Sequence, residues 1–134
     1  MKLAEAVAAV HAAGIVHCDL KPTNVMVQLR GAAGAPSVHI IDFGMALPLG
    51  QCHPESSKGR QSWYCACVHQ GTPLTEQCDV VGVGVMLQFV AESMKMPPAA
   101  LQALAERAQR PEHDQRPTLE EIGQALGEML RLCQ

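Results

Sequence analysis

The first stretch of the chain carries apolar residues at the spacing of a helix that buries one face. Apolar side chains recur every three or four residues, at Leu3, Ala6, Val7 and Val10. Alanines fill most of the remaining positions, and Gly14 supplies the residue type that ends helices in a left-handed conformation. The pattern predicts a helix over residues 1–14.

Two short runs of β-forming residues come next along the chain. The first is residues 24–27, NVMV, and the second is residues 38–41, VHII. Between them, residues 28–37 read QLRGAAGAPS, and their glycines, proline and serine are typical of a connecting loop. The sequence therefore predicts an antiparallel hairpin with a long tip.

The second half of the chain consists of one loop-like segment followed by three predicted helices. Prolines and glycines interrupt residues 45–61 so often that no periodicity survives. Residues of about 76–91 are apolar nearly all round, which is typical of a buried helix, although their valines are also compatible with a strand. Two further helices are expected over about 99–132, the last one opened by the capping-box spacing of Thr118 and Glu121.

Length, composition and charge narrow the class of protein. A chain of 134 residues with 48% apolar and 17% charged residues is typical of one globular domain. Its net charge of -3 leaves no basic surface for nucleic acid. The longest apolar run is too short to cross a bilayer, and the N-terminus has no secretory signal. We therefore expect no nucleic-acid or membrane partner, and an intracellular location, cytoplasmic or nuclear.

Six cysteines raise the question of disulfides or a zinc site. They are Cys18, Cys52, Cys65, Cys67, Cys78 and Cys133. The Cys65-x-Cys67 pair can be drawn as a metal cluster with His69, Cys78 and the Cys52-His53 pair. However, it lacks the second closely spaced pair that is usual among zinc ligands. The sequence favours reduced, scattered thiols.

One polar stretch, HCDLKPTN at residues 17–24, carries the candidate chemistry. Asp19, Lys21 and Asn24 put a carboxylate, an ammonium and a carboxamide on one loop before the first predicted strand. A carboxylate can take the proton of an acceptor hydroxyl, a cation can meet an anionic group in transfer, and oxygen ligands can hold Mg²⁺. Asp42 follows the second predicted strand and adds another carboxylate. The set suits phosphoryl transfer.

HCDLKPTN followed by IDFG resembles the catalytic loop and the metal-binding DFG motif of eukaryotic-type protein kinases. The resemblance covers roughly residues 1–132 and implies a partial kinase domain over residues 1–134, namely its C-terminal lobe. The implied fold is mainly α with a small β-hairpin. Its parts are the catalytic loop at 17–24, the DFG motif at 42–44, the activation segment at 45–68, the central helix at about 76–91 and the C-terminal helices at about 99–132.

The resemblance also implies roles for individual residues. Asp19 is the expected catalytic base, and Lys21 is the cation that meets the phosphate in serine/threonine-specific loops. Asn24 and Asp42 are the expected Mg²⁺ ligands at the ATP site. Met26 lies where the family packs an aliphatic side chain beneath the adenine, although a core methionine explains it equally well. Structural support is expected from His17, Phe43, Gly44, Asp79 and Arg116.

Some of the supporting residues have specific implied contacts. His17 is expected to be buried near Phe43 and not to act as a base. Asp79, in the first turn of the central helix, is expected to accept hydrogen bonds from the backbone of the catalytic loop.

Arg116 stands in DQRPT, which resembles the closing arginine motif of the family. The usual partner of that arginine is a glutamate, and Val68 in WYCACV stands in its place. A buried charge without its partner costs about 3–5 kcal/mol. Asp114 or a nearby acidic residue is the candidate substitute.

Cys18 stands where most family members carry an arginine, so the chain is expected to be of the non-RD type. That arginine normally pairs with a phosphate on the activation segment, and its replacement removes the charge reason for a phosphorylation switch. Ser56, Ser57 and Ser62 are hydroxyls in this segment, but serine in a loop is more often a turn residue. We expect little effect of phosphomimetic changes there.

Two functions remain open at this point. The 134 residues contain no glycine-rich phosphate loop and no strand lysine with a partner glutamate, so a fragment, completed by an N-terminal lobe, is expected. One function is an ATP- and Mg²⁺-dependent serine/threonine kinase lobe that acts on a protein hydroxyl and is weakly active or inactive alone. The other is a non-catalytic, kinase-like binding or scaffold module.

Overall fold

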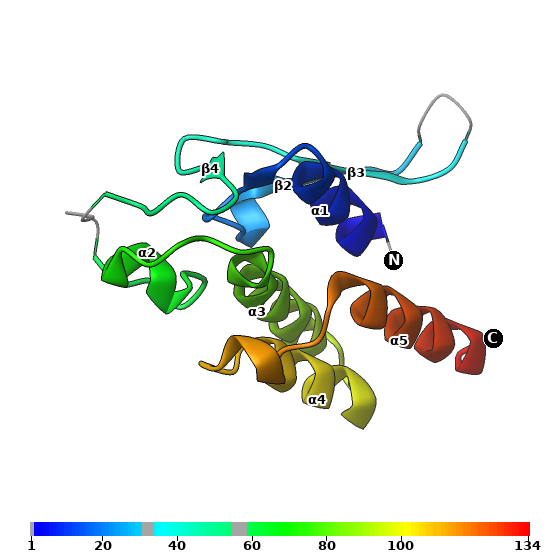
Figure 1. Cartoon of the computed structure of the whole chain (residues 1–134). Helices are drawn as coiled ribbons and strands as arrows, with labels where there is room; N and C mark the ends of the chain where they lie inside the picture. The colour runs from blue at the N-terminus through cyan, green and yellow to red at the C-terminus, as the bar shows by residue number, and fades with distance from the viewer. Residues whose placement is uncertain (1, 31–33, 55–58) are drawn as a thin grey trace.

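The structure is a computed structural model that describes residues 2–30, 34–54 and 59–134 (Figure 1). The helices within these ranges are α1 (Lys2–Ala12), α2 (Ala66–Gln70), α3 (Gln77–Ser93), α4 (Ala99–Ala108) and α5 (Leu119–Leu132), with the 3-10 turns η1 (Pro22–Asn24) and η2 (His113–Gln115). The strands are β1 (Ile15–Val16), β2 (Val25–Gln28), β3 (Ser37–Ile40) and β4 (Leu47–Pro48). The chain is thus mainly helical with a small hairpin, as the sequence predicts.

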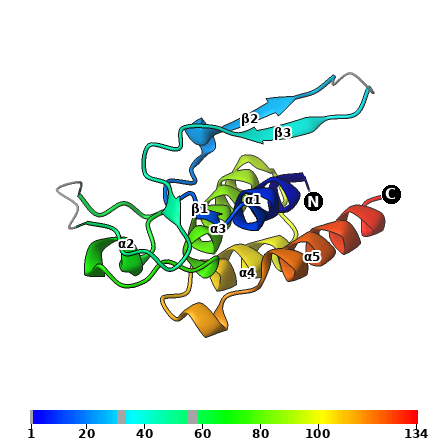
Figure 2. The same cartoon turned by 45° about the horizontal axis from the view of Figure 1, so that its top comes forward.

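β2 and β3 form the predicted antiparallel hairpin. Val25 lies opposite Ile40 and Gln28 lies opposite Ser37, so each strand differs from its predicted range by one residue. Figure 2 shows the hairpin extending past the helices, and its predicted tip includes residues 31–33, which lie outside the described ranges. The short β1–β4 pair was not predicted, because strands of two residues leave no periodicity to detect.

α3 is the centre of the helical part. Its residues from Cys78 to Leu87 are buried on nearly all sides, whereas Gln88, Phe89 and Val90 are exposed. Burial all round the first turns settles the ambiguity between helix and strand in favour of the helix. α4 packs along α3, and α1 and α5 complete the core. No helix in the described ranges is long and apolar enough to cross a membrane.

Gly82 on α3 lets the 17–24 loop lie directly on the central helix. A Cβ atom at this position would lie 2.6 Å from both the Cβ and the carbonyl oxygen of Leu20. Because real Cβ atoms do not approach other atoms so closely, only glycine fits without a shift of the loop. Leu20 is almost completely buried in this contact and follows Asp19 directly.

A second buried cluster surrounds the first turns of α3. It joins the start of the 17–24 loop to α2 and α3 through Val16, Cys18, Met45, Cys65, Cys67, Val68, Leu74, Cys78 and Val81. The expectation of scattered thiols is therefore wrong, because four of the six cysteines share this cluster. Cys52 and Cys133 are exposed, and all six cysteines are free.

Candidate active site

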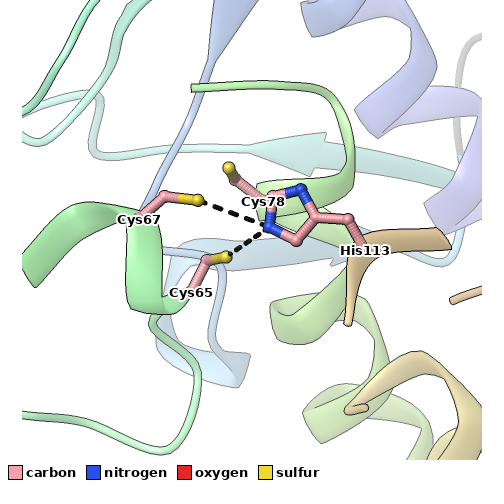
Figure 3. A group of neighbouring side chains, drawn as sticks. All are labelled: Cys65, Cys67, Cys78 and His113. Atoms are coloured by element: carbon pink, nitrogen blue, oxygen red, sulfur yellow. Dashed lines mark hydrogen bonds between the residues drawn. The ribbon is translucent and has the colours of Figure 1, made fainter. Parts of the chain in front are cut away.

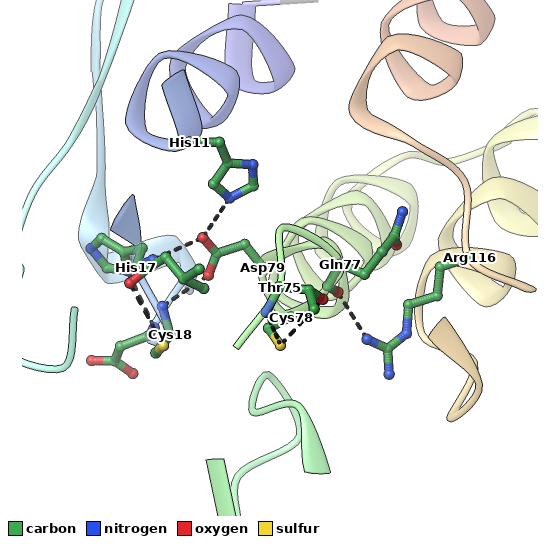
Figure 4. A network of polar contacts seen from close by, with 10 residues as sticks. His11, His17, Cys18, Thr75, Gln77, Cys78, Asp79 and Arg116 are labelled. Carbon is green, nitrogen blue, oxygen red and sulfur yellow. Dashed lines mark hydrogen bonds and ion pairs between the residues drawn. The ribbon is translucent and has the colours of Figure 1, made fainter. Parts of the chain in front are cut away.

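Asp79, in the first turn of α3, anchors the start of the 17–24 loop (Figure 4). One of its oxygens accepts a hydrogen bond from the amide of His17 and the other accepts from the amide of Cys18, each at 2.8 Å. This is the contact that the resemblance implies for Asp79. Cys18 has a φ of 68°, a left-handed conformation that costs free energy for a residue with a side chain. The two amide bonds stabilise that turn and thereby position Asp19.

His11 is a third partner of Asp79 that the sequence interpretation missed. Its Nε2 lies 2.8 Å from Asp79 Oδ2, and both side chains are buried. His11 continues the buried face of α1 that Ala4 and Val7 begin. The sequence could have indicated this contact, because a histidine on the apolar face of a helix is expected to be buried and a buried imidazole requires a polar partner.

Asp19 is buried, and three side chains surround its carboxylate. Trp63 Nε1 donates a hydrogen bond of 2.7 Å to Oδ1. Asn24 Nδ2 donates to Oδ2 at 3.2 Å and to the Asp19 carbonyl at 2.9 Å. The ammonium of Lys21 lies 3.7 Å from Oδ2. The structure thus brings the predicted Asp19, Lys21 and Asn24 together, while their catalytic roles stay predictions.

Trp63 is the second site residue that the sequence interpretation missed. Its indole covers Asp19 on one side, and the Lys21 ammonium lies 5.1 Å from its ring centroid, within range of a cation–π interaction. Trp63 is the single tryptophan of the chain. It lies 44 positions from Asp19, so no local spacing connects the two residues.

The predicted Mg²⁺ ligands lie at the same end of the hairpin. The amide of Ile41 donates to the carbonyl of Asn24 at 3.0 Å, which sets Asp42 one residue beyond this pair. Asn24 uses its amide nitrogen toward Asp19, so its side-chain oxygen is the atom left for a cation. Asp42 is exposed, has a φ of 60°, and accepts at Oδ1 from the amide of Gly44 at 3.2 Å. One neutral and one anionic oxygen donor fit Mg²⁺, which keeps several of its waters in such sites.

His17 connects the 17–24 loop to the DFG motif. Its ring is fully buried and meets the ring of Phe43 edge-on, with 4.9 Å between centroids. Nδ1 accepts from the amide of Asp19 at 3.2 Å, so Nε2 carries the proton and donates to the carbonyl of Ile41 at 3.0 Å. Both ring nitrogens are occupied, which agrees with a structural role.

Met26 lies on β2 with 57% of its surface exposed. The explanation as a core methionine is therefore wrong. Its predicted place beneath an adenine stays a prediction, and an exposed thioether beside the candidate site is compatible with it.

Arg116 is buried, and its guanidinium is held by backbone carbonyls. It donates at 2.6 to 3.0 Å to the carbonyls of Arg110, Pro111 and Gln77. Within the described part of the chain it has no carboxylate partner, and Asp114 is exposed elsewhere. The expectation that Asp114 or a nearby acidic residue replaces the family glutamate is wrong.

The remaining neighbour of Arg116 is a thiol. Arg116 Nη1 lies 3.4 Å from Cys65 Sγ. Hydrogen bonds from Cys78, Arg116, the Cys67 backbone and His113 together lower the pKa of Cys65 well below its ordinary value, against the effect of burial. The Cys65 sulfur therefore lies beside this guanidinium, where the family has a carboxylate.

Cys18 carries no charge at neutral pH. Burial, followed by the nearby Asp79, raises the pKa of its thiol to about 12. A neutral thiol cannot replace an arginine as a partner for phosphate. Ser56 and Ser57 lie outside the described residues, and Ser62 is exposed.

A helical domain whose buried aspartate anchors an Asp-x-Lys-x-x-Asn loop beside a DFG hairpin defines the protein kinase class. The sequence pattern of the protein kinase domain matches residues 1–131, so the chain belongs to the protein kinase family. It is 28% identical over 151 aligned residues to the serine/threonine-protein kinase PkaA of Streptomyces coelicolor, which covers 93% of this chain and 27% of PkaA.

Two other bacterial kinases are also similar to the chain. The serine/threonine-protein kinase Pkn1 of Myxococcus xanthus is 32% identical over 118 residues, which covers 72% of this chain and 17% of Pkn1. The serine/threonine-protein kinase PkaB of Streptomyces coelicolor is 45% identical over 47 residues, which covers 33% of this chain and 11% of PkaB. The chain therefore spans at most 27% of the length of these relatives.

Proposed function

We propose that the chain is the C-terminal lobe of an ATP- and Mg²⁺-dependent serine/threonine protein kinase, with a protein hydroxyl as phosphoryl acceptor. The observation that carries the proposal is the grouping of Asp19, Lys21 and Asn24, in which Lys21 and Asn24 lie within 3.7 Å of the Asp19 carboxylate. The names of the similar kinases support the serine/threonine class.

Each residue of the loop has a distinct role in this proposal. Asp19 orients the acceptor hydroxyl and takes its proton, and the half-buried Lys21 supplies positive charge to the phosphoryl group in transfer. Asn24 and Asp42 would hold Mg²⁺, which neutralises phosphate charge when bound. Asn24 also fixes the Asp19 carboxylate through its amide nitrogen, so the loop is oriented before substrate arrives.

The exposed apolar residues of the hairpin support the proposal that another part of the protein covers the site. Met26, Val27 and Leu29 on and after β2 are 57%, 59% and 75% exposed, and Phe43 is 46% exposed. Met26 and Val27 are consecutive residues of β2, so their side chains point to opposite faces of the hairpin, and each face carries an exposed apolar residue. We assign the Met26 side to an adenine and the other exposed apolar residues to contact with an N-terminal lobe, and we expect the chain alone to bind nucleotide weakly. An intracellular location, cytoplasmic or nuclear, is part of the same proposal, because ATP is the phosphoryl donor.

A second function, a non-catalytic binding or scaffold module, is favoured by the contact between Trp63 and Asp19. The indole N–H occupies the Asp19 oxygen that faces away from Asn24 and Lys21. In a binding module this contact would be permanent, because no substrate hydroxyl needs the carboxylate.

Phosphoryl transfer decides between the two functions. We would assay the 134-residue chain, and the same chain fused behind the glycine-rich lobe of a serine/threonine kinase, with γ-labelled ATP, Mg²⁺ and a mixed protein substrate. The fused protein should label serine and threonine, and Asp19→Asn should reduce the rate by about 10²–10⁴-fold. The exposed Asp114→Asn is the matched control and should keep the rate.

Two outcomes would contradict the kinase proposal. A folded fusion protein that transfers no phosphate supports the binding module, and labelling of tyrosine contradicts the serine/threonine class. Nucleotide binding by the chain alone is measured separately, as thermal stabilisation by Mg²⁺ and ATP with Asp42→Asn as control. Strong stabilisation that is lost in Asp42→Asn would contradict our expectation of weak binding.

A further inference from the structure

Three buried cysteines and a histidine converge at a place distinct from the 17–24 loop (Figure 3). Cys65 and Cys67 lie at the start of α2, Cys78 lies in the first turn of α3, and His113 opens η2. Their sulfur atoms and one imidazole nitrogen all lie within 4.8 Å of one another. Three segments that are far apart in the sequence therefore bring four possible ligand atoms together at one point.

We propose that Cys65, Cys67, Cys78 and His113 bind a structural Zn²⁺ ion. Three thiolates and one imidazole are a usual ligand set of closed, tetrahedral zinc sites. Bonds of about 2.3 Å to sulfur and about 2.0 Å to nitrogen put the ligand atoms of such a site roughly 3.5–3.8 Å apart. His113 Nε2 lies 3.1 Å from Cys65 Sγ and 3.3 Å from Cys67 Sγ. Shifts of about 1 Å or less would therefore complete the tetrahedron.

Thr75 orients two of the four ligands. Its hydroxyl oxygen lies 3.3 Å from His113 Nδ1, and a proton on Nδ1 leaves the lone pair of Nε2 directed at the sulfur atoms. The backbone amide of Thr75 donates to Cys78 Sγ at 3.3 Å, which stabilises a thiolate there. Hydrogen bonds of this kind to the outer atoms of the ligands are typical of protein metal sites.

Arg116 balances the charge of the proposed site. Three thiolates around Zn²⁺ carry a net charge of about -1, and the Arg116 guanidinium lies 3.4 Å from Cys65 Sγ. Without a cation, several thiolates in this buried cluster would be unfavourable, because like charges repel each other at such short separations. A divalent cation removes this cost, since it binds thiols in their deprotonated form.

The zinc ion would also explain how α2 is held without the family glutamate. Val68 stands in place of that glutamate, and the guanidinium of Arg116 has no carboxylate partner in the described ranges. A zinc–thiolate centre would supply the negative charge and would fix α2 against α3 and η2. This inference is independent of phosphoryl transfer.

The test measures metal in the purified 134-residue chain. We expect about one zinc per chain by mass spectrometry of the metal content, and none above background in Cys78→Ser or His113→Ala. Cobalt alone, added to metal-free protein, should give the visible absorption of tetrahedral Co²⁺ with thiolate-to-cobalt charge transfer. The double variant Cys52→Ser with Cys133→Ser changes the two exposed thiols and should keep the zinc. His113→Cys should keep it as well.

A variant of Thr75, which is not itself a ligand, tests the site further, and two results would contradict the proposal. Thr75→Val keeps all four ligands and should weaken zinc affinity about 10–100-fold, measured in competition with a chromophoric chelator. His113 is half-exposed, so His113→Ala remains informative if Cys78→Ser does not fold. Equal zinc content in wild type and His113→Ala would overturn the proposal. A chain purified with reduced thiols that holds no zinc and takes up none when zinc is added would overturn it too.

Discussion

Trp63 and Asp19 are joined by a hydrogen bond of 2.7 Å between the indole Nε1 and the carboxylate Oδ1. Lys21 and Asn24 both contact the other carboxylate oxygen. If Asp19 accepts a proton from a substrate hydroxyl, Oδ1 is the oxygen that Lys21 and Asn24 leave available. In the proposed kinase the indole would therefore compete with the acceptor hydroxyl for Oδ1.

Replacement of Trp63 by phenylalanine tests this competition. Trp63→Phe removes the N–H donor but keeps an aromatic ring beside Lys21. A hydrogen bond to a charged group contributes about 1.5–3 kcal/mol, so its removal should lower the KM for protein substrate by roughly 10–150-fold in the fused enzyme. Steady-state kinetics with varied protein substrate is the measurement.

The neighbouring Tyr64→Phe is the matched control for Trp63→Phe. It removes one polar group from the same segment and leaves the indole bond in place, so KM should not change. An unchanged or raised KM in Trp63→Phe would show that the indole does not compete with substrate at Asp19.

Local patterns in the sequence predicted most of the fold. The 3–7–10 spacing in α1, the capping box of α5 and the turn residues between β2 and β3 each act over a few positions. Thr118 and Glu121 make the reciprocal bonds of that capping box. The contacts of Trp63 and His11 were not predictable in this way, since each joins residues more than 40 positions apart. Only the tertiary fold brings such pairs together.

Asp79 should be among the most sensitive positions for stability. Asp79→Asn leaves one acceptor oxygen for three neighbouring groups and places an NH₂ group against a backbone donor. We expect the free energy of unfolding to fall by about 3–5 kcal/mol, measured by urea denaturation. Glu76→Gln, an exposed change just before the same helix, should alter it by less than about 0.5 kcal/mol. Similar small changes in both variants would mean that Asp79 does not anchor the 17–24 loop.

Two glycine-to-alanine substitutions should have opposite effects on stability. Gly82→Ala puts a Cβ atom 2.6 Å from Leu20 and should lower the free energy of unfolding by about 1–3 kcal/mol. Gly123→Ala lies inside α5, where an added Cβ meets nothing within 4 Å, and should raise it by about 0.5–1 kcal/mol. Denaturant titration of both variants is the check. A stabilised Gly82→Ala would contradict the close contact between α3 and the 17–24 loop.

The residues of the 17–24 loop could be predicted from the sequence, whereas the contacts of Arg116 could not. Asp19, Lys21 and Asn24 lie within six positions, and their chemistry can be read from one loop. The partner of Arg116 could not be read in this way, because a thiol and three carbonyls replace the expected carboxylate. Every residue has a backbone carbonyl, so the sequence does not show which carbonyls will accept hydrogen bonds from Arg116.

The capping box of α5 should make stability depend on pH. A hydrogen bond from the amide of Thr118, then one from Arg107, lowers the pKa of Glu121 below its ordinary value of 4.5. Because the folded pKa is the lower one, the contribution of Glu121 is complete above the unfolded pKa and is lost as the pH falls through the folded pKa. The difference in melting temperature between wild type and Glu121→Gln should therefore shrink from about pH 6.5 to about pH 3. Glu128→Gln, an exposed change near the other end of α5, should show no such convergence, and a constant difference for Glu121→Gln would contradict the prediction.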